Sequence, residues 1–272
     1  MTTITLSLEK SIPENANEYF DKAKKLKSKL EGTQKAIAQT EKELSEFKEK
    51  ESQYLDHKDK EKKIATYRKK EWYEKYRHTI LSDEKLFVLG KDATSNEVIV
   101  KKYLEQDDII LHSQAPGSPF GIIKHGRDAC TESVILEAAQ YLLCFSKQWK
   151  SGFGTADAFW VYPEQVSKTA NTGEFMSKGS FMIRGEKHIL KNVQLKIYLT
   201  ARTTQLGEEK IEYTELFSGS EQACKKYGKM VLCFEPGDYT SKQIAKELKG
   251  KLKCSFEDLP KFLPSGCRIK KY

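Results

Sequence analysis

The first 80 residues constrain the fold most, because they have the composition of a charged helical arm. From residue 11 to about residue 50 the chain is dominated by Lys, Glu, Ala, Gln and Leu. Ser11 and Glu14 have the spacing of a capping box, and Pro13 is tolerated in a first helical turn. Gly32 costs such a helix about 1 kcal/mol without ending it. A heptad seam runs along this segment, with apolar residues at Leu26, Leu30, Ile37, Leu44 and Phe47 and with Thr33 and Thr40 in two weak d positions. We therefore predict a coiled-coil arm over residues 1–80.

The seam is interrupted across residues 51–63, where Lys, Asp, Glu and His dominate. Apolar residues return in the following stretch at Ile64, Tyr67, Trp72, Tyr73 and Tyr76. Two helical stretches around a polar gap favour an antiparallel hairpin with its tip near residues 50–60. One long bent helix is the alternative. In either form the arm is too charged to bury a core of its own.

From residue 81 the pattern changes to short apolar runs separated by turns and helices. Strands are predicted at residues 86–89, 108–112, 120–124, 158–162, 181–184, 193–199 and 230–234. A capping box at Thr94–Glu97 predicts one helix, and further helices are predicted from Thr131 to Gly152, over 240–248 and over 256–263, with a turn at 236–238. No regular βαβ alternation is present, so the fold class is predicted to be α+β. We expect an RNA-binding-type domain at 81–191 and a small basic α/β tail at 192–272.

Charge is distributed unevenly along the chain. The formal net charge is +8 and the pI is about 8.9. Residues 1–71 hold 17 Lys and Arg against 14 Asp and Glu, residues 72–186 hold 13 against 15, and residues 187–272 hold 17 against 10. The basic excess of the two flanks favours a polyanionic partner. There is no run of roughly 18 apolar residues and no signal-peptide pattern at the start, so we predict a cytoplasmic protein without a membrane partner.

The sequence contains no pattern that is typical of catalysis or metal binding. Six cysteines are scattered without a C-x-x-C pair, which favours buried thiols over zinc ligands. Phosphate-loop, dinucleotide-binding, metalloprotease and nucleophile-elbow motifs are missing. Asp107 and Asp108 are adjacent on a predicted strand and would point to opposite faces, which suits no acid–base pair. We predict no catalytic residue, no metal and no cofactor.

Two polar segments are candidates for binding. In residues 107–124 a Pro116–Gly117 turn with neighbouring hydroxyls could hold a phosphate, although for this segment taken alone a hairpin connection without a ligand is favoured. Residues 165–185 combine cations, hydroxyls and glycines with Phe175 and Phe181, a mixture that suits RNA, although Phe181 can also be a core residue. His112, at a strand end, is more typical of a structural histidine than of a general base. The candidate RNA-binding residues are His112, Ser113, Gly117, Ser118, Lys124, Lys168, Thr169, Lys178, Ser180 and Arg184.

These segments together resemble the NFACT family, which includes the NEMF-like and RqcH-like proteins. Residues 71–124 resemble the start of the family's NFACT-R RNA-binding domain, and FWVYPEQVSKTANTGEFMSKGSFMIRGEKH, residues 159–188, resembles its most distinctive block. Residues 12–37 resemble the opening of the family's coiled-coil arm, and residues 192–272 the small tail of archaeal members.

The resemblance implies a non-catalytic role in ribosome-associated quality control. Family members bind large ribosomal subunits obstructed by peptidyl-tRNA and hold tRNA while untemplated residues are added to the stalled chain. The expected partners are therefore large-subunit rRNA and tRNA. Because the match begins at the coiled-coil arm, we expect a separate N-terminal NFACT half, with a fragment or a stand-alone protein as alternatives. A protein–protein adaptor and a subunit of an RNA-processing enzyme are the competing functions.

Overall fold

The computed structural model describes residues 4–115, 117–167, 179–207, 210–248 and 259–270. The chain divides into two compact units, Met1–Thr66 and Tyr67–Tyr272, and each is described by itself. No helix within the described ranges is both long enough and apolar enough to cross a membrane.

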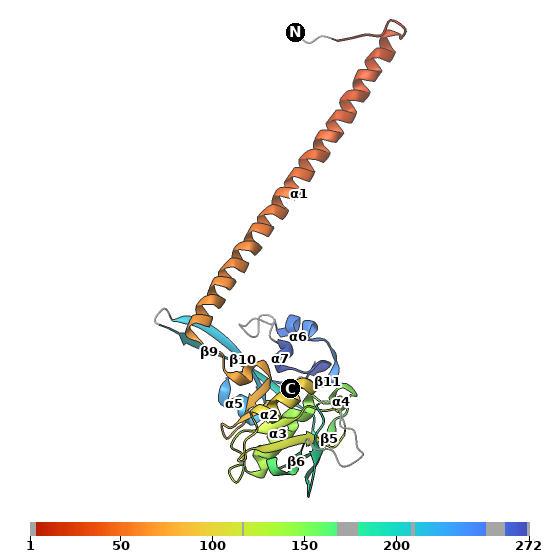
Figure 1. The fold of residues 1–272 in the computed structure, drawn as a ribbon. Helices are drawn as coiled ribbons and strands as arrows, with labels where there is room; N and C mark the ends of the chain where they lie inside the picture. The colour runs from red at the N-terminus through yellow and green to blue at the C-terminus, as the bar shows by residue number, and fades with distance from the viewer. Residues whose placement is uncertain (1–3, 116, 168–178, 208–209, 249–258, 271–272) are drawn as a thin grey trace. The chain divides into compact units, whose positions relative to one another are not determined.

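The first unit is built from one helix, α1 (Ile12–Tyr67) (Figure 1). One half of the predicted capping box is present, because the Glu14 carboxylate accepts a hydrogen bond from the Ser11 backbone N–H at 2.8 Å. It also accepts from the Ser11 hydroxyl at 2.7 Å. Five apolar side chains at the heptad positions are exposed by half or more: Leu26, Leu30, Ile37, Leu44 and Phe47. The predicted helical arm is confirmed.

The predicted hairpin is wrong, since α1 continues for 56 residues without a turn. Residues 51–63 interrupt the apolar seam but contain neither Gly nor Pro. Their Lys, Glu and Gln side chains are good helix formers, so the backbone continues where the seam stops.

The second unit contains a six-stranded sheet that is antiparallel throughout, in the order β1-β2-β4-β3-β5-β8. Its strands are β1 (Arg77–Ile80), β2 (Leu86–Leu89), β3 (Ile109–Ser113), β4 (Gly121–Ile123), β5 (Thr155–Val161) and β8 (His188–Gln194). A two-stranded ribbon joins β6 (Val166–Ser167) to β7 (Met182–Ile183).

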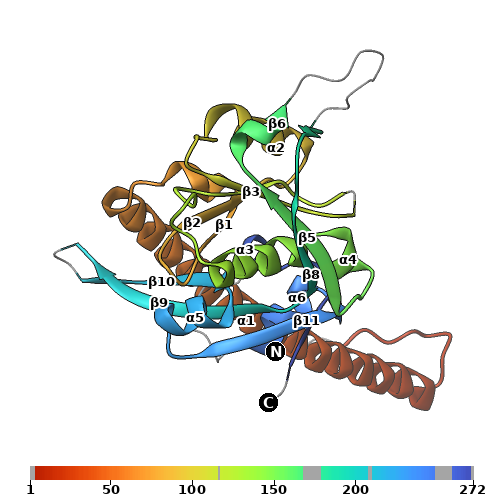
Figure 2. The ribbon, with the colours of Figure 1, turned by 90° about the horizontal axis from the view of Figure 1, so that it is seen from below.

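Helices cover both faces of this sheet, and Figure 2 shows β3 between α2 and α3. They are η1 (Trp72–Lys75), α2 (Ala93–Lys102), α3 (Glu132–Cys144), α4 (Lys147–Lys150) and η2 (Pro163–Gln165). Phe87 and Leu89 belong to the core under α3, whereas Val88 between them packs with Ile99 of α2. The central strands are continuous apolar runs because both of their faces are buried.

A second sheet, in the order β10-β9-β11-β12, completes the unit. Its elements are β9 (Ile197–Leu206), β10 (Ile211–Gly219), α5 (Glu221–Tyr227), β11 (Val231–Tyr239), α6 (Ser241–Leu248), α7 (Leu259–Phe262) and β12 (Cys267–Ile269). Leu216 and Phe234 of this sheet share one hydrophobic cluster with Leu142 of α3. The Thr79 hydroxyl donates to the Ser218 carbonyl at 2.7 Å. The tail segment and the segment before it therefore share a core.

The α+β class is confirmed, and five local predictions need correction. Residues 72–80 form η1 and β1 rather than a resumed helix. The α2 cap is Asp92, whose carboxylate accepts from the Ser95 N–H at 2.8 Å, and Thr94 lies inside the helix.

The other three corrections concern longer segments. The single helix predicted from Thr131 to Gly152 is two helices, α3 and α4. The predicted strand 193–199 is two strands, β8 and β9, separated by Leu195 and Lys196. The predicted turn at 236–238 is a register shift inside β11, because Pro236 and Tyr239 both face Cys267 of β12.

Candidate functional site

A cavity of about 550 Å³ lies at one end of the six-stranded sheet. Arg77 begins β1 there, β2 and β3 end there, and β4 begins there. Its lining comes from the start of β1, residues 91–96, the end of β3, residues 117–120, residues 144–150, residues 179–183 and residues 264–265. Seven separated stretches of the chain thus meet in one cavity within the second unit.

Gly90 and Asn96 set the position of α2 at the cavity edge. The Asn96 side-chain oxygen accepts from the Phe120 N–H at 3.1 Å, and the Gly90 N–H donates to the Phe120 carbonyl at 3.0 Å. A Cβ atom at Gly90 would lie 1.8 Å from that Asn96 oxygen. Only glycine leaves room for this contact, which ties the first turn of α2 to the loop before β4.

Arg77 brings a half-buried guanidinium to the cavity wall. Its central carbon lies 4.7 Å from the centroid of the Phe145 ring, so the plane of the group is held against an aromatic face. Its Nε atom is buried and has no hydrogen-bond partner among the described residues. Burial lowers the pKa of Arg77, although a guanidinium remains charged at any physiological pH. A buried donor without an acceptor is costly, and the charge of the guanidinium as a whole makes this part of the lining attractive to an anion.

Two lysines add positive charge to the same lining, Lys91 after β2 and Lys150 at the end of α4. Burial lowers the pKa of Lys91, and the nearby charges of Arg77 and Lys261 lower it further. The acidic group in the lining is Asp92, whose carboxylate caps α2. Three cations against one carboxylate leave the wall positive.

Aromatic rings and hydroxyls form the rest of the wall. The rings of Phe120 and Phe181 are 4.9 Å apart, and Ser118 and Ser180 lie beside them in the lining. The His112 ring is 5.9 Å from Phe120, and its Nδ1 donates to the Ser113 carbonyl at 2.7 Å. Burial lowers the pKa of His112, so this ring is neutral at pH 7.

The predicted site residues are divided between this cavity and other places. His112, Gly117, Ser118 and Ser180 line the cavity. Ser113 is buried beside it, where its N–H donates to the Ser118 hydroxyl at 3.2 Å. Arg184 is exposed and is not part of the lining. Lys168, Thr169 and Lys178 lie outside the described residues.

Lys124 is the predicted binding residue that the structure argues against. Its ammonium donates to the Tyr103 carbonyl at 2.8 Å, to Glu105 at 2.9 Å and to the buried Asp108 at 2.8 Å. Only 11% of its side chain is exposed. A phosphate would have to displace two carboxylates from this lysine, so its role is to neutralise them.

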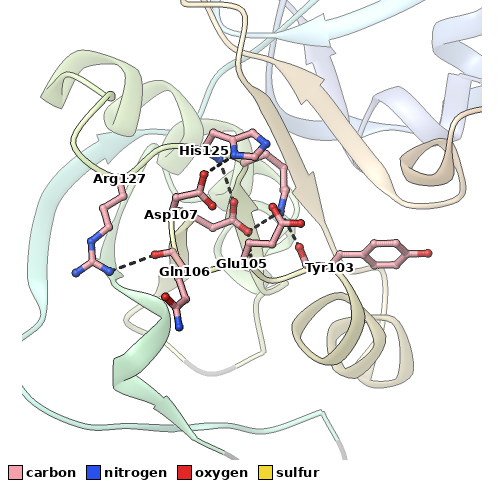
Figure 3. A network of polar contacts seen from close by, with 8 residues as sticks. Tyr103, Glu105, Gln106, Asp107, His125 and Arg127 are labelled. Carbon is pink, nitrogen blue, oxygen red and sulfur yellow. Dashed lines mark hydrogen bonds and ion pairs between the residues drawn. The ribbon is translucent and has the colours of Figure 1, made fainter.

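The surrounding polar network fixes the loop between β4 and α3 (Figure 3). Asp108 also accepts from the His125 and Glu105 N–H groups, at 3.0 and 2.8 Å. Asp107 pairs with His125 Nδ1 at 2.5 Å. The ligand atoms of Glu105, Asp107, Asp108 and His125 lie within 4.8 Å of one another, but Lys124 already supplies a positive charge to two of these carboxylates. These contacts hold the turn in place, which is a structural role.

Arg77, Lys91, Lys150 and Asn96 were missed by sequence reasoning. They lie up to 73 positions apart and share no motif, and Arg77 was placed within the predicted arm. Only the pairing of β1 with β2 brings Arg77 next to Leu89, two residues from Lys91.

Two family models match the chain. The model described as "NFACT protein RNA binding domain" matches residues 72–185, and "NFACT N-terminal and middle domains" matches residues 1–77. The archaeal Rqc2 homologue aRqcH of Methanocaldococcus jannaschii is 37% identical over 217 residues, which cover 77% of this chain and 31% of the relative. The human ribosome quality control complex subunit NEMF is 37% identical over 177 residues, 65% of this chain and 16% of the relative. The chain thus spans less than a third of these curated relatives.

Among solved structures, the C-terminal part of a fibronectin/fibrinogen-binding protein from Streptococcus suis matches with a TM-score of 0.38 and 16% identity, over 53% of this chain and 49% of that one.

Proposed function

The chain belongs to the NFACT family, and from this membership we propose that it is a non-catalytic RNA-binding component of ribosome-associated quality control. In this role it binds large ribosomal subunits obstructed by peptidyl-tRNA, and it contacts rRNA and tRNA. The peptidyl transferase centre of the ribosome makes the bonds of an untemplated C-terminal tail, while this chain contributes to holding the tRNA. We further propose that it acts in the cytoplasm together with an NFACT N-terminal region.

One observation carries the proposal: the positive cavity is built almost entirely from the segment that matches an RNA-binding domain. All of its lining except Pro264 and Ser265 falls within residues 72–185. Cations for phosphates, aromatic rings for bases and hydroxyls for base edges are the groups that RNA recognition uses.

The chemistry of the cavity wall supports a binding role over catalysis. The His112 Nδ1 donates to the Ser113 carbonyl, and its ring lies near Phe120 and Phe159, which is the environment of a structural histidine. Burial raises the pKa of the Cys144 thiol well above its ordinary value, which disfavours a reactive thiolate. The described lining therefore offers recognition groups and no activated nucleophile.

The first test is sedimentation of the full chain with purified large subunits that carry or lack peptidyl-tRNA. Each sample is prepared with and without a separately expressed NFACT N-terminal half. We expect preferential binding to the obstructed subunits, and tighter binding when the other half is present. A matched control without ribosomes detects aggregation. If as much of the chain sediments in that control as with subunits, the chain has aggregated rather than bound. No binding to either subunit at low salt would contradict the proposal.

A protein–protein adaptor is a second candidate, because the arm presents an unpaired apolar seam. Leu26, Leu30 and Ile37 are each more than half exposed at coiled-coil spacing. If the complexes of this chain survive extensive nuclease treatment, the adaptor function is favoured.

A further inference from the structure

The guanidinium of Arg77 is the starting point, because it lines the cavity and its buried Nε has no hydrogen-bond partner among the described residues. Leaving a buried donor unpaired is costly. The ring of Phe145 fixes the guanidinium from one side, and Asp92, which also lines the cavity, acts on it only as a nearby charge. The guanidinium is therefore a positive charge at the cavity that no carboxylate among the described residues neutralises by an ion pair.

The charges that face Arg77 make an anion the favoured occupant. Lys91 and Lys150 line the same cavity, and Lys261 of α7 adds its field to that of Lys91. Asp92 is the opposing charge, and its oxygen is already engaged by the Ser95 N–H and hydroxyl at the α2 cap. The field inside the cavity is thus positive on the side of β1 and α4.

Another part of the lining is aromatic. The rings of Phe181 and Phe120 are 4.9 Å apart, and Ser118, Ser180 and His112 belong to the same lining. A ligand that combines a phosphate with a flat heterocycle with polar edges would match the cations and the rings together.

The size of the cavity decides between ligand classes. A volume of about 550 Å³ falls within the range of roughly 300–1,000 Å³ that is typical of sites for single small molecules. A stacked helix presents its phosphates on a broad surface and cannot enter such a cavity. A single nucleotide that has left the stack can.

We propose that this cavity binds one unpaired nucleotide of RNA, with its phosphate against Arg77, Lys91 and Lys150 and its base along the Phe120–Phe181 wall. The inference rests on the RNA-binding function proposed above and specifies what the site accepts. Such a cavity selects for single-stranded character, because a base that is paired and stacked in a duplex cannot enter it.

The test measures binding of the full chain to a fluorescent single-stranded 12-nucleotide RNA and to the blunt duplex of the same sequence, by anisotropy. The decisive variant is Arg77→Gln, and its matched control is Lys102→Gln, which removes the same charge from an exposed position at the end of α2, outside the cavity lining. A second pair is Lys150→Gln with the exposed Lys101→Gln of α2 as its control. Lys150 is exposed, so this pair keeps the test valid if Arg77→Gln fails to fold, as judged by thermal unfolding.

We expect Arg77→Gln to weaken single-strand binding by about tenfold or more, the size expected for loss of a charged hydrogen bond. Lys150→Gln should weaken it by a smaller factor, and both controls and all duplex affinities should change by less than about twofold. If the cavity variants and their controls lose equal amounts of single-strand affinity, the effect depends only on net charge, and the inference is overturned. Unchanged single-strand binding in Arg77→Gln and Lys150→Gln would overturn it as well, while RNA binding by the wild type would leave the proposed function standing. A wild type that binds neither RNA at low salt would overturn both.

Discussion

Single buried polar residues connect parts of the second unit that are far apart in the sequence. The Glu137 carboxylate on α3 accepts from the Ser82 N–H at 3.0 Å, from the Ser82 hydroxyl at 2.5 Å and from the Ser220 hydroxyl at 3.0 Å. Glu137 is 8% exposed. One side chain thus joins the turn after β1, the central helix and the cap of α5.

Replacing this carboxylate should destabilise the unit strongly. Glu137→Ala leaves the Ser82 and Ser220 donors without their acceptor, and we expect a loss of roughly 2–4 kcal/mol in the free energy of unfolding. Urea denaturation of the full chain measures this loss. The matched control is Glu132→Ala in the exposed first turn of the same helix, for which we expect less than about 1 kcal/mol. Equal effects of the two variants would contradict the role assigned to Glu137.

Two half-buried histidines make stability depend on pH. Burial lowers the pKa of His78 and of His112 below the ordinary value of 6.5. The unfolded chain therefore takes up protons at a higher pH than the folded chain does. The stability that these histidines contribute is fully present above about pH 6.5 and is lost as the pH falls below it. The exposed His125 has the opposite sign, because its pairing with Asp107 raises its pKa and stabilises the fold at low pH.

We expect the free energy of unfolding to fall between about pH 7.5 and pH 5.5, and to fall less in His112→Gln than in the wild type. Urea denaturation at the two pH values measures both slopes. His125→Gln serves as the comparison, because removing that pair should steepen the fall. A wild type and a His112→Gln variant with identical pH slopes would show that His112 titrates normally.

At the scale of elements, α1 is a helix whose stability comes from local propensity. Its apolar side chains at the heptad positions are exposed, so packing within the first unit adds little to its stability. The residues around them are mostly charged and have a high helix propensity. A Cβ atom at Gly32 would meet nothing within 4 Å. This glycine therefore weakens the helix without serving a packing contact.

Gly32→Ala should strengthen α1 by about 1 kcal/mol. Amide hydrogen exchange of the full chain should show slower exchange for the turns around residue 32, with no change in the second unit. The negative ellipticity of the same sample at 222 nm should become stronger or stay constant. Faster exchange around residue 32 would contradict the destabilising role assigned to this glycine.

The strands behave differently from α1, because their identity depends on which faces are covered. The run Ile109–Leu111 is apolar at every position, and the structure buries it between α2 and α3. Residues 77–80 have no such run, and β1 forms because β2 offers it a complete antiparallel register. Local pattern was sufficient for β3 and insufficient for β1.

At the scale of the whole molecule, the excess of positive charge lies in the two flanking segments, residues 1–71 and 187–272. Most of the cavity lining comes from the middle segment, residues 72–186, whose net charge is negative. We propose that the arm and the basic tail provide non-specific attachment to ribosomal RNA and that the cavity provides recognition. The local field of Arg77, Lys91 and Lys150 is positive in spite of the segment average.

RNA affinity should therefore fall with salt more steeply than the cavity alone requires. Three phosphate-binding cations would contribute a log–log slope of roughly −2, at about −0.7 per contact with single-stranded RNA. We expect the full chain to exceed this slope, because lysines of the tail also contact phosphates. Titrations of the single-stranded RNA at several salt concentrations give the slope directly. A flat response would contradict the attachment role of the flanks.

The sequence alone was enough for the helical arm, the α+β class, most of the central strands and the family. Capping boxes, heptad spacing and apolar runs are local signals, and they operate wherever the chain is placed. The gap in the apolar seam predicts a hairpin in the arm, and that prediction is wrong. The helix continues through the gap because no helix-breaking residue stands there.

Only the tertiary structure decided which side chains share the cavity. Sequence spacing could not distinguish Lys124, which two carboxylates neutralise, from Lys91 and Lys150, which line the cavity. Nor could it bring Arg77 next to Phe145. Whether a cation is paired or available depends on strand register and on contacts between distant segments, and those are settled by packing of the whole core rather than by any local pattern.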